Sequence, residues 1–78
     1  MRKRKEKIWE IYFDKCKTDL TNDNYSCFIR SSRKPTKKEA LEVVKKHKAL
    51  YDGYHLLFIG ESNWDYIDEK DIWDGLEK

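Results

Sequence analysis

The chain has 78 residues, of which 41% are charged and 38% are hydrophobic, and its formal net charge is +2. This length allows one domain, so residues 1–78 are predicted to form a single domain whose first six residues are a basic, flexible arm. No apolar run approaches the roughly 18 residues of a membrane span, and the basic N-terminus lacks the apolar stretch of a signal peptide. We therefore expect a cytoplasmic protein with no membrane partner.

The small net charge hides an uneven distribution along the chain. Residues 1–50 carry 15 Lys and Arg against 7 Asp and Glu, whereas residues 51–78 carry 2 Lys against 8 Asp and Glu. An uneven charge distribution of this kind indicates what partners a protein can bind, but it does not indicate the fold. It gives two candidate binding surfaces, one basic and one acidic, unless the two halves neutralise each other within one small body.

The first two elements are predicted to be strands. Residues 7–13 and 25–31 alternate between two faces, and residues 14–24 between them are polar and rich in turn-forming residues. The connection is too long for a tight hairpin. One face of the first strand is fully apolar, since it carries Trp9, Ile11 and Phe13.

A helix is predicted next, over about residues 37–51. Pro35 disfavours helix for the residue before it, Thr36 is a good N-cap, and Glu39 completes a capping box. Gly53 is expected to end the helix in the left-handed conformation. The apolar residues recur at helical spacing and form a stripe of Ala40, Val43, Val44, His47, Leu50 and Tyr51.

The last third of the chain is predicted to form two strands and a short helix. Residues 54–60 are apolar on both faces, which indicates a central, buried strand. Residues 64–68 alternate like a short fourth strand, and Asp68 can cap a helix over 69–77. The fold class is therefore α+β: a small, mainly antiparallel sheet of three or four strands with one main helix and a short C-terminal helix, in the order β-β-α-β-(β)-α.

Metal, cofactor and catalytic sites are not expected. The soft and imidazole ligands contain no tight pair of the kind that structural zinc sites use, and Cys27 has the position of a small core residue. The aspartates at every third position from Asp65 to Asp74 do not have the spacing of a calcium loop. We expect no enzyme, no metal and no cofactor. The ligands considered are Cys16, Cys27, His47 and His55.

Nucleic-acid binding is the leading hypothesis for the basic part of the chain. Cations cluster in the N-terminal arm and around the start of the helix, where backbone N–H groups also favour anions. If the helix covers one sheet face, aromatic rings and an arginine on the other face can contact bases, unless Trp73 and Leu76 cover them. The candidate residues are Arg2, Lys3, Arg4, Tyr12, Phe28, Arg30, Arg33, Lys34 and Lys38.

Residues 3–50 resemble the arm-site DNA-binding domain of tyrosine-type integrases. The resemblance lies in "KRKEKIWEIYFD" and "TKKEALEVVKK", with Trp9, Tyr12 and Asp14 and the helix start at 36–40. Members of that family place a three-stranded sheet, backed by one helix, in the DNA major groove. The resemblance implies a DNA-facing role for Tyr12, Arg30 and Lys34. The glycine-bearing second turn of the family is absent here, and Pro35 stands where an aromatic residue is usual.

The alternative hypothesis uses the acidic end of the chain. Residues 61–76 combine acids with tryptophans, which suits a small inhibitor or adaptor, of the type found in phages and mobile elements, that binds a basic protein partner. Both hypotheses remain open, as does the choice between monomer and homodimer. The candidate protein-binding residues are Trp64, Asp65, Asp68, Asp71 and Trp73.

Overall fold

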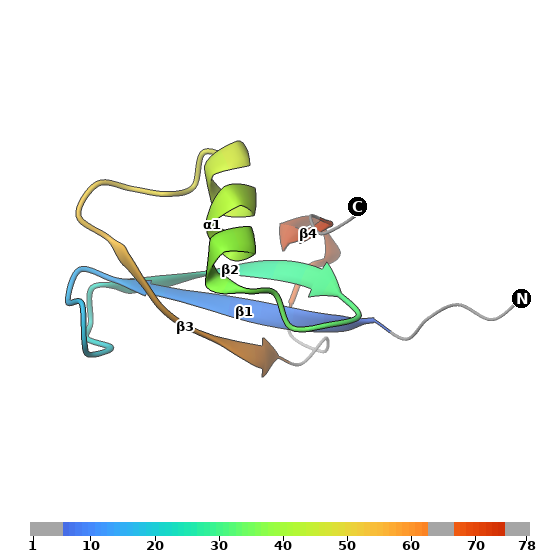
Figure 1. The fold of residues 1–78 in the computed structure, drawn as a ribbon, viewed down its shortest axis with the longest axis horizontal. Coiled ribbons are helices and arrows are strands. Elements are labelled where there is room, and N and C mark those ends of the chain that lie inside the picture. The colour runs from blue at the N-terminus through green and yellow to red at the C-terminus, as the bar shows by residue number, and fades with distance from the viewer. Residues whose placement is uncertain (1–5, 63–66, 75–78) are drawn as a thin grey trace, which may run out of the picture.

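The computed structural model describes residues 6–62 and 67–74. One helix stands on one face of a twisted four-stranded sheet (Figure 1). No helix of the described residues is long and apolar enough to cross a membrane. In chain order the elements are β1 (Lys7–Asp14), β2 (Asn24–Ser31), α1 (Lys37–Lys46), β3 (His55–Ser62), the 3-10 turn η2 (Glu69–Asp71) and β4 (Ile72–Asp74).

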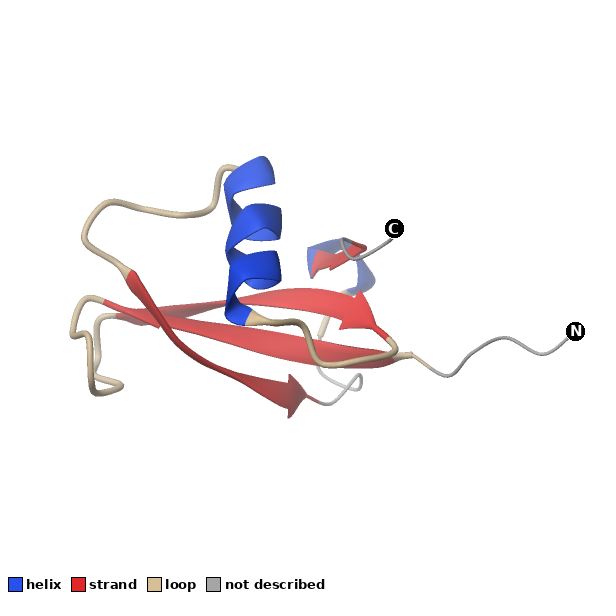
Figure 2. Ribbon diagram, in the orientation of Figure 1, coloured by secondary structure: helices blue, strands red, loops and turns tan. Residues whose placement is uncertain are grey.

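The sheet is mixed, with the strand order β3-β1-β2-β4. β1 pairs in antiparallel fashion with both β2 and β3, whereas β4 runs parallel to β2. The α+β class is therefore confirmed, but the sheet is not antiparallel throughout. β3 was predicted to be central and lies at an edge instead, next to β1. The apolar residues of β3 are used in contacts with β1, which lies beside it in the sheet, and with α1, which stands on one sheet face (Figure 2).

The register of the sheet sorts the side chains into two faces. Ile11 lies opposite Cys27 on one side and Ile59 on the other, and these residues point towards α1. Tyr12 lies opposite Ser26 and Phe58 and therefore points to the other face. Between Tyr12 and Phe13 the register with β3 shifts by one residue, so that Leu57 has no partner on β1.

Helix α1 begins where the sequence predicts and ends earlier. The Thr36 hydroxyl accepts a hydrogen bond from the Glu39 N–H, and the Glu39 carboxylate accepts one from the Thr36 N–H, so the capping box is confirmed. The last helical residue is Lys46, five residues before the predicted end. Lys48 adopts a φ of 58°, and the Ala49 N–H donates back to the Val44 carbonyl, as in a Schellman motif.

The Schellman motif makes Lys48 the left-handed residue after the helix, a role predicted for Gly53. Gly53 does have a φ of 85°, but it lies in the turn that leads into β3. The Lys48 N–H donates to the Lys45 carbonyl and the Ala49 N–H to the Val44 carbonyl, and these two hydrogen bonds offset the strain of about 1–2 kcal/mol in a left-handed residue with a side chain. The shorter helix leaves residues 49–54 as a connection beside β2.

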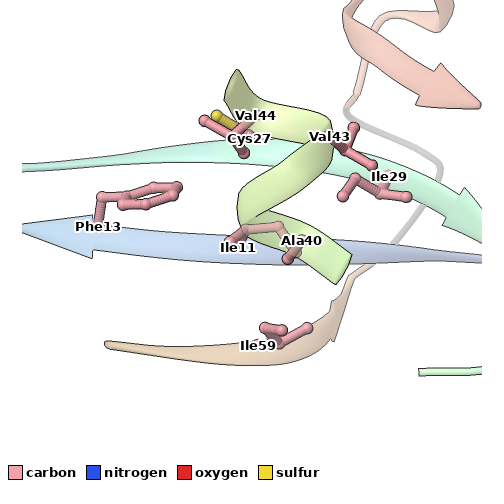
Figure 3. Close-up of a cluster of buried hydrophobic side chains, with 8 residues drawn as sticks. All are labelled: Ile11, Phe13, Cys27, Ile29, Ala40, Val43, Val44 and Ile59. Atoms are coloured by element: carbon pink, nitrogen blue, oxygen red, sulfur yellow. The ribbon is translucent and has the colours of Figure 1, made fainter. Parts of the chain in front are cut away.

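The core lies between α1 and the sheet face that it covers (Figure 3). Cys27 is buried in this core, as predicted. Trp9 packs against the same cluster, and its indole N–H donates to the Ser31 carbonyl at 3.1 Å. Three strands and the helix each contribute to the cluster, whose buried members are Ile11, Phe13, Cys27, Ile29, Ala40, Val43, Val44 and Ile59.

The prediction of a helix over 69–77 is wrong for the residues that the structure describes. Residues 69–71 form a single 3-10 turn, and residues 72–74 form β4. Ile72 and Trp73 therefore point to opposite sheet faces, although their spacing also fits one side of a helix. Residues 67 and 68 are not in a strand. The rest of the predicted fourth strand at 64–66 and of the helix at 75–77 lies outside the described residues.

Candidate functional site

The two candidate arginines of the described chain are engaged by acids of the same chain. The Arg33 guanidinium donates two hydrogen bonds to the Glu39 carboxylate, at 2.9 and 2.8 Å. Arg30 donates to Glu69, its Nε lies 3.5 Å from an Asp74 carboxylate oxygen, and its side chain is only 19% exposed. These acids raise the pKa of both arginines. The positive charge of each guanidinium is therefore largely balanced by carboxylates of the same chain before any phosphate binds.

The lysines around α1 are in the opposite situation. They are all exposed, and none of them forms an ion pair within residues 6–62 and 67–74. The two acids of the helix are Glu39, which binds Arg33, and Glu42. Exposed ammonium groups therefore line the solvent side of the helix and its two flanks. We call this region the lysine surface, and it comprises Lys34, Lys37, Lys38, Lys45, Lys46 and Lys48.

The loop that leads into α1 begins near the start of β1. Lys7 is paired with Ser31, the last residue of β2, so the loop before α1 begins beside the point where the chain enters the sheet (Figure 1). The predicted contacts Arg2, Lys3 and Arg4 lie outside the described residues. Lys7 itself lies 3.8 Å from a Glu61 carboxylate oxygen.

The sheet face opposite α1 carries aromatic rings but little free positive charge. The Tyr12 and Phe58 ring centroids are 4.4 Å apart, and Phe58 is 46% exposed. The Tyr12 hydroxyl donates to the Glu10 carboxylate at 2.9 Å, which places an acid among these rings. On the same face Phe28 is half-buried and lies opposite the buried Ile72. Among the described strand residues, this face therefore offers phosphates no cation other than the engaged Arg30.

Trp73 does not cover that face by packing on Tyr12. Its indole stacks on the His47 imidazole, with centroids 4.1 Å apart and planes at 5°, and it packs against the core from the helix side. His47 also forms a 3.0 Å hydrogen bond through Nδ1 with the Val43 carbonyl. Leu76, the other residue expected to cover the sheet face, lies outside the described residues.

A groove lies beside β2, between the connection that follows α1 and the segment that leads into β4. Its volume is about 370 Å³. Tyr51, which is 56% exposed, forms part of its wall and lies 5.4 Å from Tyr25 between ring centroids. The Tyr25 hydroxyl donates to the Ala49 carbonyl at 2.8 Å and so holds the connection in place. The lining residues are Tyr25, Ser26, Cys27, Phe28, Ala49, Tyr51, Lys70, Asp71 and Trp73.

Most residues of this groove were not predicted to form a site. Sequence periodicity assigned Tyr51 to the helix, whereas the helix ends at Lys46. Tyr51 and Tyr54 instead surround Tyr25, and the Lys15 ammonium lies 5.6 Å from the Tyr54 ring centroid, within range of a cation–π contact. The signal in the sequence is a pair of tyrosines on either side of a turn-forming Asp-Gly.

The structure describes three of the five candidate residues of the acidic surface, which are Asp68, Asp71 and Trp73. Asp68 and Asp71 are exposed and form no ion pair within the described part of the chain. Trp64 and Asp65 lie outside it. The ring of Trp73 is occupied by His47 on one side, so it is not a freely exposed anchor.

One buried carboxylate has a structural role. Asp14 ends β1, is fully buried, and accepts hydrogen bonds from the Cys16 and Thr21 N–H groups and from the Thr21 hydroxyl. Burial alone would raise the pKa of Asp14, but these donors outweigh it and hold the pKa below its usual value. Within residues 6–62 and 67–74, no three His, Cys, Asp or Glu side chains gather at a place that could hold a metal ion.

Comparison of the chain with protein-family models, with curated proteins and with solved structures found no match in any of the three. A function for this protein is therefore inferred from the residues and contacts described above.

Proposed function

We propose that this protein is a non-enzymatic nucleic-acid-binding protein that contacts phosphates through the lysine surface. One observation supports this most directly: the exposed lysines of α1 and its flanks have no acidic partner within the described residues, although both nearby arginines do. Unpaired, flexible ammonium groups are the side chains that exchange counterions for phosphates at the least cost.

The shape of the surface also fits this function. Residues 33–48 hold seven cationic and two acidic side chains, and Glu39, one of the acids, is neutralised by Arg33. The helix of ten residues spans roughly 15 Å, which matches several successive phosphates of a strand. Among the residues first expected to bind nucleic acid, Lys34 and Lys38 fit this proposal best, and Lys37, Lys45, Lys46 and Lys48 join them.

The test is the dependence of affinity on salt. Binding to DNA and RNA, single-stranded and duplex, is measured by fluorescence anisotropy at several salt concentrations. The double variant Lys38→Ala/Lys45→Ala should lower the slope of log K against log salt by about 0.7–0.9 for each phosphate that the variant no longer neutralises. Lys38→Arg/Lys45→Arg keeps both charges and should keep the slope, and Lys17→Ala in the β1–β2 loop is a second control. No binding to any of the four ligands at ~50 mM salt would disprove the proposal.

A protein partner remains the second candidate, because Asp68 and Asp71 project from one exposed turn without a cationic partner in the described chain. Charge reversal at both positions, Asp68→Lys/Asp71→Lys, should then abolish capture of a basic protein and leave the circular dichroism spectrum unchanged. An unchanged pull-down would rule this candidate out.

A further inference from the structure

We propose that the groove beside β2 holds an unpaired nucleobase, so that the ligand of this protein is single-stranded nucleic acid. This inference rests on the proposed function and adds the form of the ligand. The groove has the features that recognise a flat, aromatic molecule with a polar rim. Its volume of about 370 Å³ lies at the lower end of the range for small-ligand sites, and four of its nine lining residues are aromatic.

The aromatic walls come from three separate elements. Tyr25 and Phe28 belong to β2, Tyr51 to the connection after α1, and Trp73 to β4. Tyr51 is the most accessible of them, since it is 56% exposed. Contacts with Tyr25 and Tyr54 orient its ring, but they do not bury it. A base that stacks on such a ring gains energy whatever its identity, because every base has an aromatic face.

Polar groups line the same groove and suit the edge of a base. The Ser26 hydroxyl can donate or accept, the Asp71 carboxylate can accept from an exocyclic amino group, and the Lys70 ammonium can donate. The backbone of β2 adds to them. β4 pairs with β2 only from Phe28 to Arg30, so the outer edge of residues 24–27 has no strand partner in the part of the chain that the structure describes.

The lysine surface supplies the complementary charge for the phosphates of the same strand. Lys45, Lys46 and Lys48 closely precede Ala49, which lines the groove. A strand with one base in the groove would therefore run its backbone past these ammonium groups. A duplex cannot use both features at once, because its bases are paired and stacked. The Tyr12 and Phe58 rings on the other sheet face lack such neighbours, since the Tyr12 hydroxyl is bonded to the acid Glu10 and the lysine surface surrounds α1 on the opposite side of the sheet.

The experiment compares three ligands of equal length: a single strand, the same strand with abasic sites in place of all bases, which has the same number of phosphates, and the duplex, which has twice as many. The wild-type protein should bind the normal single strand on the order of tenfold more tightly than the abasic strand, which is the effect expected for one stacked base. Tyr51→Ala should remove this difference. Phe58→Ala is the matched control, because it removes a similarly exposed ring from the opposite sheet face, and it should leave the difference intact.

The possible outcomes distinguish a failure of the nucleobase site from a failure of the proposed function. Equal affinity for the normal and the abasic single strand, with a normal salt dependence, would overturn the nucleobase site and leave phosphate binding in place. Loss of the difference in Phe58→Ala but not in Tyr51→Ala would move the stacking site to the other sheet face and also overturn the inference. No binding to any ligand at low salt would overturn both. The comparison of normal and abasic strands uses the wild-type protein, so it is decisive even if a variant misfolds.

Discussion

The buried Asp14 side chain stabilises the long loop between β1 and β2 through hydrogen bonds to residues of that loop. The carboxylate accepts from two backbone N–H groups and one hydroxyl, and the side chain is fully buried. Because the folded protein lowers the pKa of Asp14, the stabilisation is complete above the unfolded value of about 4 and is lost as the pH falls through the folded pKa.

The variant Asp14→Asn should therefore be less stable at pH 7. The side-chain NH2 group of asparagine would replace one carboxylate oxygen and would face the N–H and hydroxyl donors of Cys16 and Thr21 instead of accepting from them. The gap between variant and wild type should narrow as the pH falls below about 4, because the Asp14 carboxylate is protonated first in the unfolded state and only at lower pH in the folded state. Urea denaturation at pH 7 and at several acidic values measures both effects. Asp19→Asn, an exposed change in the same loop, is the control. Parallel stability curves for wild type and Asp14→Asn would refute this role.

The two thiols should differ in reactivity. Burial raises the pKa of the Cys27 thiol to about 11, whereas hydrogen bonds from the Thr18 backbone and hydroxyl lower the pKa of the half-buried Cys16. The thiolate is the reactive form. Iodoacetamide should modify one cysteine in the native protein and the second only in denaturant, as mass spectrometry would show. Rapid native modification of Cys27 would contradict its place in the core.

At the scale of the elements, the start of α1 was predictable and its end was not. Thr36, Glu39 and Pro35 act on residues next to them, so the cap can be recognised from local sequence. The end depends on Lys48 taking a left-handed conformation that lysine rarely adopts, and on the hydroxyl of Tyr25, 24 residues away, binding Ala49. Leu50 packs against the core and Tyr51 contacts Tyr25 of β2, so their apolar spacing does not indicate a further helical turn.

The capping box gives a direct prediction for helix stability. Thr36→Ala removes the acceptor of the Glu39 N–H and should destabilise the protein by about 1 kcal/mol. Chemical denaturation measures the change. Ser32→Ala, at an exposed position in the loop before the helix, should change stability by less than about 0.5 kcal/mol. An equal effect of both changes would show that the cap contributes nothing specific.

Side-chain contacts add to the hydrogen bonds that attach β4: Ile72 is buried, Asp74 lies 3.5 Å from Arg30, and Trp73 stacks on His47. β4 pairs with only three residues of β2, so its hydrogen bonds alone hold it weakly. The parallel stack of Trp73 on His47 ties it to the end of α1. In His47→Ala the amides of residues 72–74 should exchange hydrogen much faster, while those of β1 stay protected. Unchanged exchange at β4 would mean that other contacts retain it.

For the molecule as a whole, stability should depend most on the central strand. Ile11 is fully buried between α1, β2 and β3, and its replacement by alanine should cost about 2–5 kcal/mol. That is a large part of the roughly 5–15 kcal/mol that holds a domain together. Thermal unfolding of Ile11→Ala should show a strongly lowered midpoint, and Phe58→Ala, at a half-exposed position beside Tyr12, should lower the midpoint much less. Similar midpoints for the two variants would contradict this assignment of the core.

Strand positions were predictable to within one residue for β1 and β2, because alternation is local. The order of the strands was not. Leu56, Leu57, Phe58 and Ile59 indicate burial on both faces but do not say how many strands flank them. The candidate site could be predicted only in part, because its contacts also join distant parts of the chain. Lys34 and Lys38 could be chosen from charge alone. Arg30 could not be excluded from the sequence, since its partners Glu69 and Asp74 are about 40 residues further along the chain.

The unpartnered Leu57 has a consequence for the behaviour of the protein in concentrated solution. A straight, apolar edge strand is a template on which further copies can add, one after another, into fibres. The extra residue bends β3 between Phe58 and Leu56, and Glu61 places a charge near its far end. We therefore expect the irregularity at Leu57 to make β3 a poorer template for the addition of further copies than a straight strand would be.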